Sequence, residues 1–122
     1  MATVSKQLTI NVIISNVWTQ MREGSGGTAY ALPTSGSPQG DIKMIRLLNL
    51  SSGSSLVEVA ISSGSVISDA QRIIGPITLA GNRLLTDDSV HVLRNTEGLW
   101  VRANPTSGSL NVTGRASLLE MT

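Results

Sequence analysis

The chain has 122 residues, enough for one domain with a modest core, and its formal net charge is +1. Only 14% of the residues are charged, whereas 40% are hydrophobic, so the chain can fold but its surface is poor in charge. Scattered basic residues exclude the clustered charge of nucleic-acid or membrane-surface binding, and the absence of cysteine excludes disulfides, thiolate catalysis and cysteine metal sites.

The first forty residues predict an arm and a loop ahead of a tighter body. Residues 7–14 alternate between polar and apolar, which predicts a strand with one apolar face, made by Leu8, Ile10, Val12 and Ile14. From 23 to 40 the chain is rich in glycine and proline, which predicts a long loop with one short extended piece. We therefore divide the chain into residues 1–40, an N-terminal arm strand with a long Gly/Pro/Ser-rich loop, and residues 41–122, a compact β-sandwich body.

Short strands separated by turns fill the body. They are expected at 42–50, 56–61, 72–79, 83–86 and 90–93. The alternation breaks between Met44 and Ile45, which indicates a bulge or an edge twist. Ser68 and Gln71 have capping-box spacing, but Pro76 follows too soon for more than one helical turn.

Two further alternating segments, 99–103 and 110–118, lie on either side of a turn-like sequence. We interpret them as one half-buried hairpin in which Val101 faces Val112, with Trp100 and Arg102 on the outer face. The eight or nine short strands predict an all-β fold: an antiparallel β-sandwich or a small jelly-roll or Ig-like barrel, with an extended N-terminal strand or arm.

No constellation in the sequence carries chemistry. His91 is the only histidine and has no evident partner, and Asp87 and Asp88 are more typical of a solvated or capping turn than of a metal site. We expect no enzyme activity, no catalytic residues, no cofactor and no metal. The N-terminus has a short apolar run broken by Asn11, so no signal peptide or membrane span is expected.

The expected function is therefore packing against other proteins. Aromatic side chains with a polar group are favoured at interfaces, and the chain has three of them. The candidate partner-contacting residues are these aromatics, one outward arginine and the apolar face of the arm strand: Trp18, Tyr30, Trp100, Arg102, Leu8, Ile10, Val12 and Ile14. The sequence leaves open whether the arm and Trp18 cover their own body or a neighbour.

From Ile42 onward, the strands and turns follow a recognisable pattern. Its parts are LLNLSSGSSLVEVAI, IIGPITLAGNRLLTDD, HVLRNTEGLWVRA and SGSLNVTGRASLL. Over residues 42–119 this pattern resembles the small β-sandwich structural proteins of tailed bacteriophages. The pattern contains no signature residue, and no catalytic residue carries over.

The resemblance implies a virion protein made in the host cytoplasm. It favours a capsid decoration, or cement, protein that forms a homo-oligomer and packs on the major capsid protein or on tail proteins, without nucleic-acid or membrane partners. One alternative is a tail or head–tail joining component. An alternative of another class is a carbohydrate-binding or adhesive β module, which would need aromatic and polar groups converging on one face.

Overall fold

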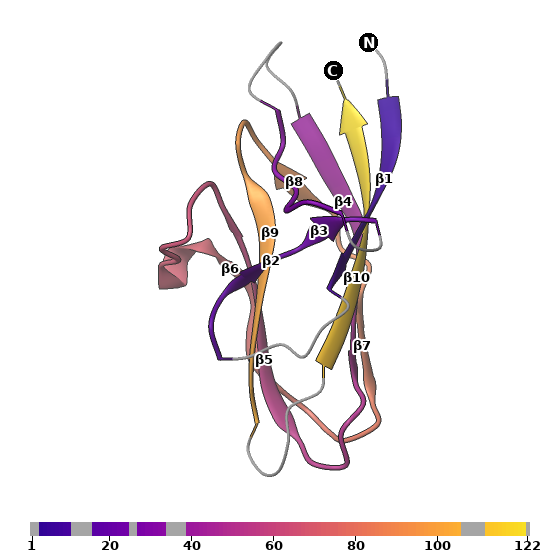
Figure 1. The fold of residues 1–122 in the computed structure, drawn as a ribbon, viewed down its shortest axis with the longest axis vertical. Coiled ribbons are helices and arrows are strands. Elements are labelled where there is room, and N and C mark those ends of the chain that lie inside the picture. Colours follow the sequence, from indigo (N-terminus) through magenta and orange to yellow (C-terminus); the bar gives the residue numbers. More distant parts are fainter. Residues whose placement is uncertain (1–2, 11–15, 25–26, 34–38, 106–111, 122) are drawn as a thin grey trace.

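Two antiparallel β-sheets face each other and enclose the core (Figure 1). The structure is a computed structural model that describes residues 3–10, 16–24, 27–33, 39–105 and 112–121. Its elements are β1 (Thr3–Ile10), β2 (Thr19–Gln20), β3 (Arg22–Glu23), β4 (Gln39–Asn49), β5 (Ser55–Ser62), the 3-10 helix η1 (Asp69–Gln71), β6 (Arg72–Leu79), β7 (Leu84–Asp87), β8 (His91–Leu93), β9 (Gly98–Pro105) and β10 (Val112–Met121).

The strands divide unequally between the sheets. The larger sheet has the order β3-β1-β10-β4-β7, and β8 also pairs with β4. The smaller sheet has the order β2-β9-β5-β6. All pairings are antiparallel, so the expected all-β sandwich is confirmed.

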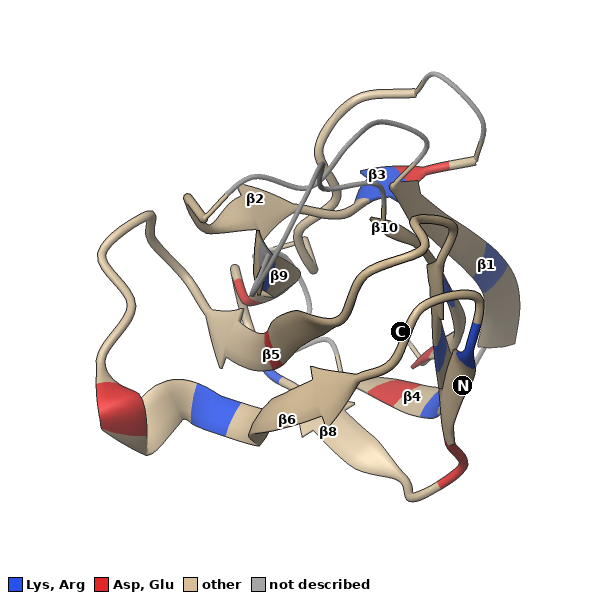
Figure 2. Cartoon of the chain, turned by 90° about the horizontal axis from the view of Figure 1, so that it is seen from below, with Lys and Arg blue, Asp and Glu red and all other residues tan. Residues whose placement is uncertain are grey.

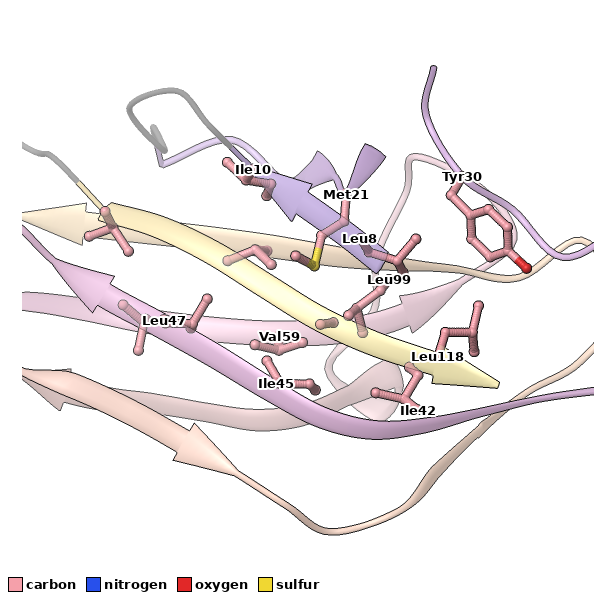
Figure 3. Close-up of a cluster of buried hydrophobic side chains, with 14 of the residues drawn as sticks. Leu8, Ile10, Met21, Tyr30, Ile42, Ile45, Leu47, Val59, Leu99 and Leu118 are labelled. Atoms are coloured by element: carbon pink, nitrogen blue, oxygen red, sulfur yellow. The ribbon is translucent and has the colours of Figure 1, made fainter. Parts of the chain in front are cut away.

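The core lies between the sheets and takes alternate residues from both (Figure 3). On β4, the side chains of Ile42, Ile45 and Leu47 point inward and are at most 1% exposed. From the smaller sheet, Val59 and Leu99 meet them and are also fully buried. Because successive side chains of a strand point to opposite faces, this inner row leaves a second row on the outer face of each sheet.

β4 contains a bulge, one of the two irregularities predicted near Met44 and Ile45. The register against β10 shifts between two neighbouring residues: Ser117 lies opposite Met44, whereas Leu118 lies opposite Ile42. Lys43 therefore has no residue opposite it in β10. The extra residue lets Ile42 and Ile45, three positions apart, both face the core. The predicted helical turn is also present as η1, closed by a capping box between Ser68 and Gln71.

The predicted C-terminal hairpin is wrong. β9 pairs with β2 and β5 in the smaller sheet, and β10 pairs with β1 and β4 in the larger one. Val101 and Val112 both face the core, but from opposite sheets. Alternation assigned the faces correctly because it is a local property, whereas the strand partner is set by tertiary packing.

The separation of an N-terminal arm from the body also needs correction for the described residues. β1 pairs with β10 along its whole length, from Thr3 opposite Met121 to Ile10 opposite Gly114. Leu8 and Ile10 belong to the common core. The apolar face of this strand is therefore covered by the body of its own chain, and a boundary at residue 40 falls between strands of one sheet.

Asn49 links the two sheets at one end of the sandwich. Its buried side-chain amide donates to the carbonyl oxygens of Gly53 at 2.9 Å and of Leu79 at 3.0 Å, and its own oxygen accepts from Ser51. These bonds fix the turn between β4 and β5 against the end of β6.

No helix among the described residues is long and apolar enough to span a membrane.

Candidate functional site

The outer face of the smaller sheet carries the two outward residues predicted for 99–103. Leu99 and Val101 of β9 face the core, so Trp100 and Arg102 between them face outward. The register with β5 places Trp100 opposite Ala60 and Arg102 opposite Glu58. This pairing puts an arginine directly beside a nearly buried acid.

Glu58 lies between two arginines on this face. Arg102 Nε donates to Glu58 Oε2 at 2.7 Å, and Arg72 Nη1 donates to Glu58 Oε1 at 2.6 Å. The side chain of Glu58 is 10% exposed, against 33% for Arg102 and 24% for Arg72. The hydrogen bond from Arg102 does most to hold the pKa of Glu58 below its ordinary value, with Arg72 adding to the effect and burial opposing it.

The chain's own tryptophans extend this cluster. The guanidinium carbon of Arg102 lies 4.6 Å from the centre of the Trp18 ring, a cation–π contact. Trp100 Nε1 donates to the carbonyl oxygen of Ser62 at 3.2 Å. Both indoles are partly buried and held by groups of the same chain. We call Trp18, Trp100, Arg102, Glu58 and Arg72 the arginine–glutamate cluster.

A depression of about 370 Å³ lies beside this cluster. It is lined by Asn16, Leu56, Glu58, Pro76, Arg102 and Asn104. The lining presents amide, carboxylate and guanidinium groups next to one leucine and one proline. An ionised glutamate held by two arginines is a poor proton acceptor, so this surface is suited to polar contacts with a partner rather than to acid–base catalysis.

The remaining candidate residues are divided between the core and the undescribed segments. Leu8 and Ile10 are 0% and 4% exposed, and Tyr30 is 6% exposed. All three belong to the core of this chain, whereas the sequence had predicted them as partner-contacting residues. Val12 and Ile14 lie outside the described residues. A variant that lacks residues 1–16 would lose β1, so the deletion would affect folding as well as any assembly.

Tyr30 makes one buried polar contact. Its hydroxyl donates to Glu120 Oε2, and both residues are buried at the edge of the core. Burial raises the pKa of the Tyr30 hydroxyl, and the bond to Glu120 raises it further. The tyrosine is therefore a neutral donor that satisfies a buried carboxylate.

His91 has a partner that the sequence did not reveal. Its Nε2 lies 2.9 Å from Asp87 Oδ2, and the Ser89 backbone N–H donates to Asp87 Oδ1 at 2.9 Å. Burial opposes ionisation of Asp87, but these hydrogen bonds outweigh it and lower its pKa.

Within the described part of the chain, no group of three or more His, Asp and Glu residues could hold a metal ion.

A second polar surface, which the sequence pattern did not reveal, lies on the outer face of the larger sheet. Arg46 of β4 lies directly opposite Arg115 of β10. Both arginines are exposed, and both line each of two neighbouring hollows of about 220 and 140 Å³. Alternation could place each arginine on an outer face, but only the strand pairing brings them together. We call Arg46 and Arg115, with the adjacent Met44, Leu48 and Leu84, the basic face.

Comparison with known proteins identifies a similar fold. The chain resembles a chain of a solved structure described as the acidic stable capsid structure of Helicobacter pylori bacteriophage KHP30, with a TM-score of 0.52 and 13% sequence identity. The match covers 100% of this chain and 89% of the other. No protein-family profile matches the chain, and no curated protein matches it in sequence.

Proposed function

We propose that the chain is a structural protein of a bacteriophage virion that acts by packing against other virion proteins. The observation that carries the proposal is the likeness in fold to a chain of a phage capsid structure, which extends over the whole of this chain. The likeness also extends over 89% of the other chain.

The surface supports a packing role. Several large apolar side chains are exposed along β7, β8 and the loop between them: Leu84 at 53%, Val90 at 56% and Val92 at 40%. With few charged residues to oppose association, such side chains favour contact with other proteins. A partner that covered this edge would also cover the free side of two short edge strands.

The size of the chain allows several such contacts. A specific interface covers about 800 Å² on each partner, and the accessible surface of the chain is 6385 Å². Contacts with two or three neighbours therefore leave most of the surface free. Within the virion we favour a capsid decoration, or cement, role, in which a small rigid sandwich binds where shell subunits meet.

Mass spectrometry of particles produced by the organism that encodes the chain tests this proposal. The particles are separated into heads and tails on a density gradient before analysis. A fixed stoichiometric amount in heads supports the decoration role, and the same result in tails supports the tail alternative. Absence from both fractions overturns the virion proposal.

A further inference from the structure

The basic face places two like charges side by side. In an antiparallel pair, directly opposite residues have close β-carbons, and like charges there destabilise the sheet. Arg46 and Arg115 occupy such a position, and no carboxylate among the described residues forms a salt bridge with either. A carboxylate from outside the chain would remove this repulsion.

The shape of the basic face fits an acid with an apolar neighbour. Besides the two arginines, Leu48, Leu84, Thr113 and Gly114 line the smaller hollow. Leu84 is 53% exposed, so part of this surface is apolar. Guanidinium groups bind carboxylates through paired hydrogen bonds, and two adjacent guanidiniums present several donors to one carboxylate.

The chain itself carries a group of this kind on its opposite side. Val66 is 88% exposed, and the side chain of Asp69 is 92% exposed. The one ion pair of Asp69 in the described structure is to Arg72 at 3.4 Å, and that arginine also binds Glu58 at 2.6 Å. Asp69 therefore retains the capacity to bind a second cation. We call residues 66–69 the acidic tip.

The tip and the basic face point away from each other. In Figure 2 the segment that leads into β6 lies at the far left, whereas β4 and β1 of the larger sheet lie at the right. A contact between these two surfaces therefore joins different parts of two molecules. Such heterologous contacts repeat from copy to copy and form a ring or an open chain.

We propose that a second copy of this chain docks its acidic tip on the basic face, with the Asp69 carboxylate between Arg46 and Arg115 and Val66 against Leu84. The inference rests on the proposed function in that it names one packing partner of the virion protein as another copy of itself. The opposite charges of the two surfaces and the exposed apolar side chain beside each charge carry it.

Sedimentation of purified protein at low and high salt tests the contact. Wild type is expected to associate in a concentration-dependent and salt-sensitive manner. The double variant R46E/R115E and the single variant D69R are each expected to weaken association roughly ten-fold or more, because attraction becomes repulsion. Mixing the two variants is expected to restore association, because the reversed tip then meets the reversed face.

Matched controls separate this contact from a general effect of charge. R94E reverses another exposed arginine and D88N neutralises another exposed aspartate, and both should associate as wild type does. Far-UV circular dichroism checks folding, and R46Q/R115Q removes the positive charges without adding negative ones. This variant should also weaken association.

Three outcomes overturn the proposal. One is a wild-type protein that stays monomeric up to about 1 mM, because its dissociation constant then lies above that concentration and its binding free energy is weaker than about 4 kcal/mol. The second is association unaffected by either reversal. The third is loss of association in R46E/R115E but not in D69R, which would mean that the basic face binds a segment of the second copy other than the acidic tip. Each result is independent of whether virions contain the chain, so this inference and the proposed function fail separately.

Discussion

Replacing Glu58 with glutamine removes the charge that holds two arginines on the outer face of the smaller sheet. The substitution keeps the size of the side chain and one oxygen acceptor, but it ends both charge-assisted bonds, which are 2.6 and 2.7 Å long. Breaking a fully buried ion pair costs about 3–5 kcal/mol, whereas exposed pairs contribute about 0.2–1 kcal/mol.

The exposed fractions of the three side chains place the expected cost of Glu58→Gln between these two limits. The acid is 10% exposed, but water can reach both arginines, which are 24% and 33% exposed. We expect the free energy of unfolding to fall by about 2 kcal/mol at pH 7, in the range of hydrogen bonds to charged groups. For a chain of this length, that corresponds to a drop in Tm of roughly 6–10 °C.

The pH dependence gives a second readout of the same interaction. Because the pKa of Glu58 lies below 4.5 in the folded chain, its ionised form stabilises the fold above that pH. This stability is lost as the pH falls through the folded-state pKa. The difference between wild type and Glu58→Gln should therefore be full at pH 7 and shrink as the pH is lowered below 4.5.

Urea denaturation followed by tryptophan fluorescence and by far-UV circular dichroism measures both effects. Trp18 and Trp100 lie in the cluster itself, so the second signal checks that unfolding is global. Asp88→Asn removes a charge from an exposed residue and serves as the control. A loss below about 0.5 kcal/mol at pH 7, as for ordinary surface substitutions, or a difference unchanged by acid would refute the reasoning.

Three further predictions concern the stability of the fold. Leu47→Ala should lower the free energy of unfolding by about 2–5 kcal/mol in urea denaturation, because it leaves a cavity at a fully buried position. The control Leu50→Ala, at a half-exposed position, should change the free energy of unfolding by less than about 1 kcal/mol. Gly81→Ala should lower Tm, because its new β-carbon would overlap with the backbone oxygens of Ser51 and Ser52 in the turn between β4 and β5. Gly64→Ala should leave Tm unchanged, because the space around Gly64 is open. Tyr30→Phe should cost about 1–3 kcal/mol, because it leaves a buried glutamate without its donor; equal stability of the two proteins would contradict the assigned bond.

The sequence predicted the faces of strands better than their partners. Alternation over 99–103 correctly placed Val101 inward and Arg102 outward. The same alternation could not show that β9 and β10 belong to different sheets, since a hairpin and a crossing between sheets have the same local pattern. A short separation between two strands favours a hairpin, but β9 and β10 pair with strands of different sheets.

The polar clusters were hidden for the same reason. Glu58 stands alone in the sequence, and its partner Arg102 comes from a strand much later in the chain. Arg46 and Arg115 are likewise far apart until β4 and β10 pair. The capping box before β6 was predictable because its residues are neighbours in sequence, whereas clusters built by strand pairing need the register.

The position of β10 has a consequence for how the chain is made. This strand lies between β1 and β4 in the larger sheet, yet in the described part of the chain it follows every other strand in sequence. During translation the edge of β1 that pairs with β10 therefore stays unpaired until residues 112–121 have been made. Folds dominated by such distant pairings form slowly, on the millisecond-to-second scale. A ribosome that stalled before residue 112 would hold two unjoined parts of one sheet, so the larger sheet is completed only once Val112–Met121 has been made.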